Sequence, residues 1–353
     1  MTIEQLLQVT IQKGASDLHL IAYSEPTLRI HGHLTPVPNA APLTPDEVEK
    51  LVFALLTQEQ REMFLANKEI DFSFALGDVA RFRVNAYYQK GYISAALRML
   101  PLRIRNIDEL GLPNILFRFT QMMQGFVLMC GPTGHGKSTS LAAMINEINQ
   151  NRACHILTIE DPIEYVYPKA KAFVSQRELL LDTHSWDVAL SSALREDPDV
   201  VLIGEMRNYE TIGSAITIAE TGHLVFSTLH TNSAPQAIDR IVDVFPEHQQ
   251  DQVRLQLAET LVAVISQRLI PSLNGERIVV NEILINTPAV KTIIREGKTH
   301  LLDNVIQTSG DLGMESIESA LSRKVKSGQI SLQVAQSYAN NVKELNRILG
   351  TGK

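Results

Sequence analysis

The chain has 353 residues, of which 44% are hydrophobic and 20% charged, and its formal net charge is -7. This composition is that of an ordinary globular protein, and the length favours two domains over one. The negative charge argues against non-specific binding to nucleic acid or anionic lipid, since both need a positive surface. The sequence has no apolar run near the roughly 20 residues of a membrane-spanning helix, and its N-terminus lacks the basic and apolar regions of a signal peptide. We therefore expect a cytoplasmic protein without a transmembrane segment.

The two cysteines, Cys130 and Cys154, are too few to make a zinc site by themselves. A cytoplasmic location also argues against a disulfide between them. We expect both to be small buried apolar side chains.

The first 100 residues are predicted to form a small α+β domain. Residues 3–13 have the spacing of a helix, and residues 28–30 alternate as in a strand. Residues 44–66 form a second amphipathic segment, in which Thr44 can cap a helix and Pro45 can take its first position.

A β-hairpin is predicted next. Residues 72–76 and 80–87 have strand-like sequences, and Gly77-Asp78 between them is a turn signal. A proline-containing linker over 101–113 then leads into a second domain, predicted over 114–353.

The second domain shows short apolar strands alternating with helical stretches from residue 125 onward. This alternation indicates βαβ units and a mostly parallel sheet. After residue 271 the sequence predicts a pair of strands, 277–280 and 282–284, followed mainly by amphipathic helices.

The strongest motif is GPTGHGKS at 131–138, which fits G-x-x-x-x-G-K-[ST] and lies between an apolar strand and a helix. Its glycines let successive backbone N–H groups point at phosphate oxygens, and the following helix adds its positive end. Lys137 is expected to reach the β- and γ-phosphates of ATP, and Ser138 to bind Mg²⁺. The candidate nucleotide-binding residues are Gly131, Pro132, Thr133, Gly134, His135, Gly136, Lys137, Ser138 and Thr139.

Such a loop also needs an acidic group at the end of a neighbouring strand, to hold the metal and the attacking water. The strand VVLIGE ends at Glu205, and the strand HILTI is followed by Glu160, Asp161 and Glu164. Both place carboxylates at the carboxyl end of a strand, where ligands bind in open α/β sheets.

Two histidines, His223 and His230, bracket a further apolar strand. His230 stands at the carboxyl end of that strand with the other candidate groups. A histidine in this place could sense the γ-phosphate.

Four segments in this order resemble the Walker A, Asp, Walker B and His boxes of the secretion and type IV pilus ATPases: GPTGHGKST, ILTIEDPIEY, ALREDPDVVLIGEMRNYET and TGHLVFSTLHTNSA. They span residues 131–234, and the N-terminal segments 14–20 and 81–85 match the same family. The resemblance therefore covers nearly the whole chain. His135 departs from the small residue usual at its position, which is a variable one.

The resemblance implies an α/β fold in which a RecA-like P-loop NTPase domain, with a C-terminal helical region, follows a smaller α+β PAS-like domain, assembled as a ring-shaped homohexamer. It also implies that Glu164 polarises the attacking water, that Glu205 lies near Mg²⁺ and that His230 is the sensor. Guanidinium groups of the N-terminal domain would stabilise charge on the transferring phosphoryl group. The matching arginines are Arg83, Arg98 and Arg81, of which the first and last share one strand face.

Within this family the sequence favours a retraction motor. It lacks the four-cysteine insertion and the longer N-terminal extension of assembly and type II secretion ATPases. Residues 289–300 partly match a segment associated with retraction motors, and they also predict an amphipathic helix that ends at Gly297 and presents Arg295 and Lys298 outward. We expect an ATPase that drives type IV pilus retraction and twitching motility, peripherally bound at the inner membrane to a platform protein and acting indirectly on pilin.

Other functions remain open on sequence alone. An accessory retraction motor and a pilus assembly or type II secretion ATPase are poorly separated from this prediction by motifs. A RecA-like DNA translocase is disfavoured by the net charge of -7. A nucleotide switch without hydrolysis is disfavoured by the strand-end acids.

Overall fold

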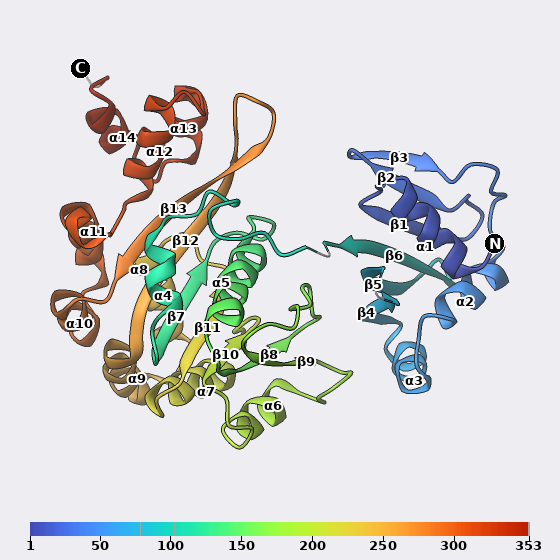
Figure 1. Ribbon diagram of the computed structural model, residues 1–353, viewed down its shortest axis with the longest axis horizontal. Helices are drawn as coiled ribbons and strands as arrows, with labels where there is room; N and C mark the ends of the chain where they lie inside the picture. The colour runs from blue at the N-terminus through green and yellow to red at the C-terminus, as the bar shows by residue number, and fades with distance from the viewer. Residues whose placement is uncertain (78, 102, 352–353) are drawn as a thin grey trace. The chain divides into compact units, whose positions relative to one another are not determined.

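The computed structural model describes residues 1–77, 79–101 and 103–351, and the chain divides into two compact units (Figure 1). The first unit comprises Met1–Arg103 and Asp161–Val166, and the second comprises Ile104–Glu160 and Tyr167–Lys353. The sequence did not predict that residues 161–166 would group with the first unit.

The predicted linker, 101–113, is divided between the two units, with the boundary after Arg103. Ile107 and Leu112 are buried in the core of the second unit. The later part of this segment is therefore packed structure, and Leu102 lies outside the described residues.

The first unit has the α+β character predicted for it. Its six strands form one antiparallel sheet in the order β3-β2-β1-β6-β5-β4. The strands are β1 (Asp17–Ile21), β2 (Thr27–Ile30), β3 (His33–Pro36), β4 (Glu69–Leu76), β5 (Ala80–Gln89) and β6 (Tyr92–Leu100), and the helices are α1 (Ile3–Gln12), α2 (Pro45–Phe53) and α3 (Gln58–Asn67).

The segment 44–66, predicted as one amphipathic stretch, is two helices. Thr44 caps α2 and Pro45 takes its first turn, as predicted. The chain then leaves the helix after Phe53, because Thr57 starts a second capping box in which its side chain accepts from the backbone of Gln60.

The predicted hairpin is confirmed, since β4 and β5 pair in antiparallel register up to Leu76 and Ala80. Gly77 has a φ of 55° in the connection, and Asp78, predicted in this turn, lies outside the described residues. Phe82 and Val84 of β5 are buried in the core. Polar residues alternate with them and occupy the opposite face of the sheet.

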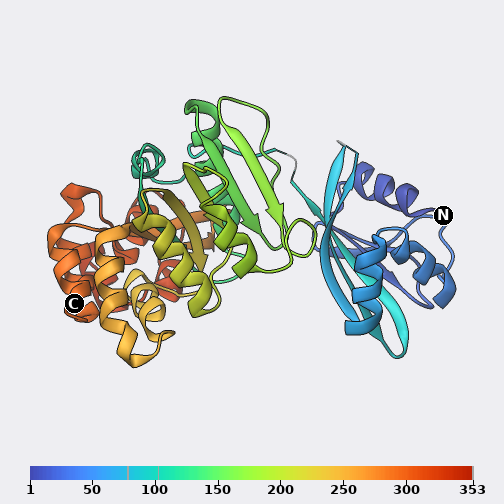
Figure 2. The same cartoon turned by 90° about the horizontal axis from the view of Figure 1, so that it is seen from below.

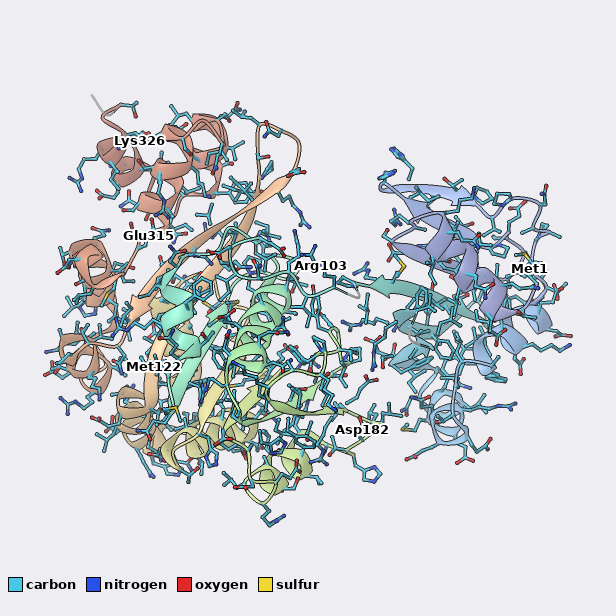
Figure 3. The ribbon with its side chains drawn as sticks, in the orientation of Figure 1. Met1, Arg103, Met122, Asp182, Glu315 and Lys326 are labelled. Atoms are coloured by element: carbon cyan, nitrogen blue, oxygen red, sulfur yellow. The ribbon has the colours of Figure 1, made fainter. Side chains whose placement is uncertain are left out.

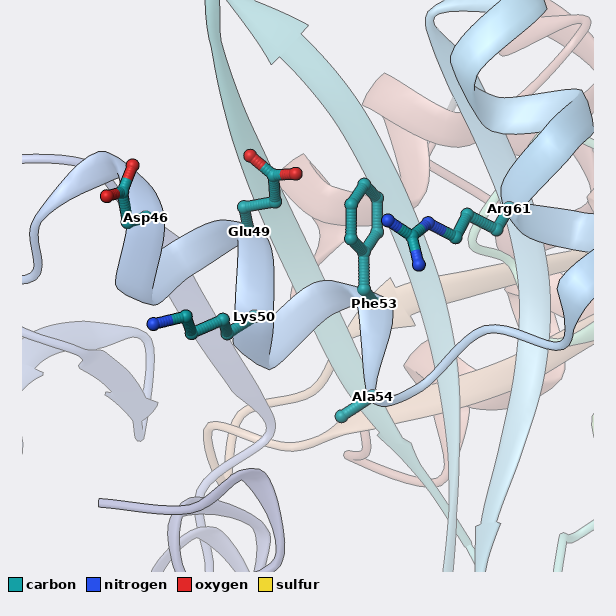
Figure 4. Close-up of a pocket in the computed structure, with 6 residues that line it drawn as sticks. All are labelled: Asp46, Glu49, Lys50, Phe53, Ala54 and Arg61. Carbon is teal, nitrogen blue, oxygen red and sulfur yellow. The ribbon is translucent and has the colours of Figure 1, made fainter.

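A hollow of about 530 Å³ opens on the first unit along α2 and α3 (Figure 4). The Arg61 guanidinium stacks over the Phe53 ring, with its carbon 4.0 Å from the ring centroid. The hollow is lined by Asp46, Glu49, Lys50, Phe53, Ala54 and Arg61, none of which belongs to the predicted site.

The second unit contains a seven-stranded sheet in the order β13-β12-β7-β11-β10-β8-β9, parallel except for β13. The predicted βαβ character is confirmed. The strands are β7 (Gly125–Cys130), β8 (His155–Glu160), β9 (Phe173–Glu178), β10 (Val200–Ile203), β11 (Leu224–Leu229), β12 (Leu261–Pro271) and β13 (Arg277–Ile285).

Helices cover both faces of this sheet (Figure 2). Alternate residues of β7 point to opposite cores: Phe126 and Leu128 join one cluster, and Val127 and Met129 join the other. The helices are α4 (Ile115–Thr120), α5 (Lys137–Asn151), α6 (Trp186–Ala193), α7 (Tyr209–Glu220), α8 (Ala234–Asp243), α9 (Glu247–Thr260), α10 (Pro288–Arg295), α11 (Leu302–Thr308), α12 (Ile317–Lys326), α13 (Leu332–Tyr338) and α14 (Val342–Leu349), with 3₁₀ turns at η1 (Thr299–Leu301) and η2 (Gly310–Leu312).

The predicted strand pair 277–280 and 282–284 is wrong, because both pieces belong to one strand, β13. Asn281 is the residue between the two predicted pieces. It is buried opposite Gln267 of β12, and its Nδ2 donates to Gln267 Oε1 at 3.3 Å. Satisfying a polar side chain across the sheet lets the strand continue.

The chain after β13 is mainly helical, as predicted, and Met122 and Glu315 in Figure 3 mark the approaches to β7 and α12. Helix α10 ends just before Gly297, whose φ of 65° suits a glycine at this position, and Arg295 and Lys298 are exposed. Across the described ranges, none of the helices combines the length and apolar character that crossing a bilayer requires.

Candidate functional site

The predicted phosphate loop lies between a buried strand and the N-terminus of a helix. Strand β7 is buried along its length and ends at Cys130, and α5 begins at Lys137. Gly136 precedes the helix with a φ of 81°, and within the described chain no side chain caps this end. The first-turn amides of a 15-residue helix therefore face the loop, an arrangement that attracts phosphate.

Lys137 places its ammonium group at this loop. The residue is buried, and Nζ donates to the carbonyl oxygens of Gly131 at 2.7 Å and Pro132 at 3.1 Å. Positive charge and helix amides thus converge on one point, which fits the phosphates of a nucleotide. Ser138 and Thr139 follow Lys137 in the first turn of α5.

His230 follows β11 and connects the loop to the neighbouring strand end. Its Nδ1 lies 3.3 Å from both Lys137 Nζ and Thr133 Oγ1, and its Nε2 lies 3.0 Å from Glu205 Oε1. Because an ammonium can only donate, Nδ1 accepts and Nε2 carries the proton that is donated to Glu205. The contacts therefore select the neutral Nε2–H tautomer.

Glu205 lies just beyond β10 and is held between two partners. Oε1 accepts from His230, and Oε2 accepts from Arg207 Nη2 at 3.0 Å. Burial acts to raise the pKa of Glu205, but the hydrogen bond and charge of Arg207, with His230, outweigh it and hold the pKa below its usual value. The carboxylate is therefore ionised, as a metal ligand must be.

The remaining predicted acids divide between the two units. Glu160 ends β8 in the second unit, where its Oε1 accepts from Thr158 Oγ1 at 2.7 Å and Gln176 Nε2 at 3.3 Å. Glu164 belongs to the segment 161–166, which groups with the first unit. The structure therefore brings Glu205, His230 and the phosphate loop together. Glu164 instead lies near Arg83 of the first unit.

The three predicted arginines lie on the face of the first unit's sheet opposite its core. Arg83 and Arg98 are direct cross-strand neighbours on β5 and β6, and Arg81 precedes them by two residues on β5. Arg81 Nη2 donates to Ser73 Oγ at 2.5 Å. The alternation of buried and half-buried residues along β5 confirms that Arg81 and Arg83 share one face.

Arg83 and Arg98 each pair with an aspartate from an adjacent strand. Arg83 donates through Nε, at 3.1 Å, and through Nη2 to Asp71, while its Nη1 lies 3.9 Å from Glu164 Oε1. Arg98 Nε donates to Asp17 Oδ1 at 2.9 Å. The hydrogen bond to Asp71 is the main cause that raises the pKa of Arg83.

Sequence reasoning missed Asp71 and Asp17 as partners. Asp71 comes directly before the predicted strand 72–76; in the structure it belongs to β4 and lies diagonally across from Arg83 on the same face. Asp17 lies directly opposite Arg98 only through pairing of β1 with β6, which are far apart in sequence.

The two cysteines are free and Cys130 is buried, as expected, whereas the prediction that Cys154 is buried is wrong, because this residue is only half-buried. Burial raises the pKa of the Cys130 thiol to about 11. This thiol is therefore not ionised near neutral pH.

Comparison with known proteins places these features in context. The family model described as "Type II/IV secretion system protein" matches residues 1–303. The chain is 46% identical, over 96% of its length, to the type IV pilus retraction ATPase PilT of Pseudomonas aeruginosa, and covers 98% of that protein. It is 39% identical, over its whole length, to the type IV pilus ATPase PilU of the same organism, and covers 92% of that protein.

Solved structures give the same grouping. The structure of the pilus retraction motor PilT with bound ADP matches with a TM-score of 0.92 and 43% identity, covering 98% of this chain and 99% of that one. The ATPase DotB of Legionella pneumophila matches with a TM-score of 0.85 and 27% identity, covering 96% and 95%. The predicted α/β fold class, with a RecA-like P-loop domain following a smaller N-terminal domain, is confirmed.

Proposed function

Because the chain belongs to the family of type II/IV secretion system proteins, we propose that it is an ATP-hydrolysing motor that drives type IV pilus retraction. The likeness to a pilus retraction ATPase over almost the whole length of both chains carries the proposal. The convergence of Lys137, Glu205 and His230 at one end of the sheet supports it.

In this proposal the loop 131–139 binds the ATP phosphates. Its backbone amides and the N-terminus of α5 receive the phosphate oxygens, and Lys137 exchanges its loop carbonyls for the β- and γ-phosphates. Ser138 and Glu205 would hold Mg²⁺. When bound, Mg²⁺ would supply charge neutralisation at the phosphates.

Hydrolysis needs groups from the first unit. Glu164 polarises the attacking water, and Arg83 and Arg98, with Arg81 as a third contributor, neutralise charge on the γ-phosphoryl group. To do so, Arg83 gives up its pairing with Asp71 and Glu164, because its guanidinium pairs with both carboxylates in the described structure. His230 senses the γ-phosphate by giving up its contact with Lys137 or Thr133 for one with that phosphate.

The motor we propose is a homohexameric ring in which ATP binding and hydrolysis alter the angle between the two units of each subunit. It acts in the cytoplasm at the base of the pilus, bound peripherally at the inner membrane to a platform protein. Its stroke removes pilin subunits from the fibre indirectly, through that partner. No nucleic acid takes part.

An accessory retraction motor is the second candidate, favoured by 39% identity to PilU over the whole chain. A secretion ATPase is less favoured. The type II secretion protein E of Aeromonas hydrophila matches only 77% of this chain, and the chain covers 54% of it.

Deletion of the gene in its host tests the proposal. We expect excess surface pili with loss of twitching motility, restored by the wild-type gene but not by a Lys137→Ala variant. Bald cells would indicate an assembly motor instead. Loss of retraction force, with pilus number and basal twitching kept, would indicate the accessory motor.

A further inference from the structure

Gln267 of β12 packs against both ends of the phosphate loop. The residue is 1% exposed. A Cβ added at Gly131 would lie 2.3 Å from the Gln267 carbonyl oxygen, and one added at Gly136 would lie 3.2 Å from its Nε2. Only glycine allows this close approach at Gly131, whose φ is 143°.

The side-chain amide of Gln267 also bonds to the middle of the loop and to the helix behind it. Nε2 donates to the carbonyl oxygen of His135 at 2.8 Å, and Oε1 accepts from Ser140 Oγ at 2.8 Å. Asn281 Nδ2 donates to the same Oε1 at 3.3 Å. One buried amide therefore fixes the loop, the first turns of α5 and β13 relative to each other.

Two further contacts hold the tip of the loop on the same side. The backbone N–H of Leu269 donates to His135 Nδ1 at 3.0 Å, and Arg277 Nη1 donates to the Gly134 carbonyl at 3.2 Å. Burial lowers the pKa of His135, and the charges of Arg277, Lys137 and Arg268 lower it further. A neutral imidazole keeps Nδ1 free to accept from Leu269.

These contacts bear directly on phosphate binding. Because the loop carbonyls accept hydrogen bonds from β12 and β13, the amides of the loop point away from those strands. A loop that is already held in place also loses less conformational entropy when a ligand binds. From this geometry we propose that Gln267 is a positioning residue, which presets the phosphate loop through the carbonyl of His135. The inference rests on the proposed function, in which the loop binds ATP.

The substitution Gln267→Glu separates positioning from general stability. A carboxylate keeps the acceptor for Ser140 and Asn281 but repels the His135 carbonyl, whereas a protonated carboxyl can donate to it as the amide does. We expect the Kd for a fluorescent, non-hydrolysable ATP analogue with Mg²⁺ to rise about tenfold at pH 8. The ratio of variant to wild-type Kd should fall towards one as the pH is lowered to 5.5.

Taking the ratio at each pH removes the titration of His135 and the effect of its charged neighbours. Gln267→Met should raise the Kd for the analogue by a similar factor, and lowering the pH should not restore it. This variant is used in place of Gln267→Glu if that one fails to fold. Asn149→Asp is the matched control: Asn149 is also buried, and its Nδ2 donates to the Pro168 carbonyl of another loop. This control should leave the Kd unchanged at every pH.

Equal Kd values for wild type and both Gln267 variants, or the same weakening in Asn149→Asp, would overturn the inference. Failure of the wild type itself to bind the analogue would overturn the proposed function instead, so the two failures can be told apart. A shift of KM for ATP that matches the Kd shift, with kcat nearly constant, is the expected kinetic signature.

Discussion

His230 donates through Nε2 to Glu205 at 3.0 Å, while Nδ1 on the other side of its ring faces Lys137 at 3.3 Å. The imidazole thus connects the acid that follows β10 to the lysine that begins α5. A change at the phosphate loop can therefore reach Glu205 through the hydrogen bonds of this ring. This is the arrangement expected of a sensor of the bound nucleotide.

We predict that His230→Ala leaves analogue binding within about threefold but lowers ATPase activity by roughly 10²-fold, because Glu205 loses its aligned donor. Steady-state phosphate release and analogue titration measure the two effects. The control is His223→Ala at the opposite end of β11, where His223 Nδ1 lies 3.0 Å from Thr221 Oγ1. Equal loss of activity in both variants would contradict the sensor role.

Glu164→Gln is expected to keep nucleotide binding and to remove nearly all turnover, since a general base contributes about 10²- to 10⁴-fold. The amide has the shape of the carboxyl but cannot accept a proton at neutral pH. Single-turnover phosphate release measures the chemical step. If release continues at the wild-type rate, Glu164 is not the catalytic base; Glu220→Gln, on the surface of α7, is the control.

Combined replacement of Arg83 and Arg98 by alanine should lower ATP hydrolysis by about 10³-fold or more, the range of arginine fingers in other P-loop enzymes. Analogue binding and the unfolding of the second unit should change little, because both arginines belong to the first unit. Arg61→Ala removes an arginine of that unit which stacks on Phe53, and so serves as the control. Retained activity in the double variant would move the finger assignment to Arg81 or elsewhere.

Glu282 makes stability depend on pH. Burial raises its pKa to about 7, Asp303 and Glu318 add to the rise, and the hydrogen bond from Ala234 N–H and the charge of Arg268 act against it. Because the pKa of Glu282 is higher in the folded state than in the unfolded state, the folded protein is most stable at pH values below the unfolded-state pKa. This contribution to the free energy of unfolding is lost as the pH rises through about 7. The loss is on the order of 3 kcal/mol.

Glu282→Gln removes this ionisation and keeps an oxygen that can accept from Ala234 N–H. We expect the variant to have a larger free energy of unfolding than the wild type at pH 8, and a similar one at pH 5. Denaturant titrations at several pH values measure both. A wild-type stability that does not fall between pH 5 and pH 8 relative to this variant would refute the prediction.

The sequence alone was enough for the features whose signals are local. The phosphate loop needs glycines and a lysine at short fixed spacing, and the strand before it and the helix after it follow from neighbouring residues. The place of Glu205 and His230 at the same sheet edge also follows, because each ends a short apolar strand and parallel strands present their carboxyl ends together. The β4–β5 hairpin was predictable for the same reason, since its partners are adjacent in the chain.

Only the tertiary structure decided which distant residues meet. Gln267 lies 132 residues beyond His135, yet it carries the contact that holds the loop, and nothing in its local pattern marks it. The predicted pieces 277–280 and 282–284 join into one strand, in which Asn281 has its partner on β12, and Asp17 reaches Arg98 only through pairing of β1 with β6. Such pairings depend on the packing of whole elements, which a local pattern of residues does not encode.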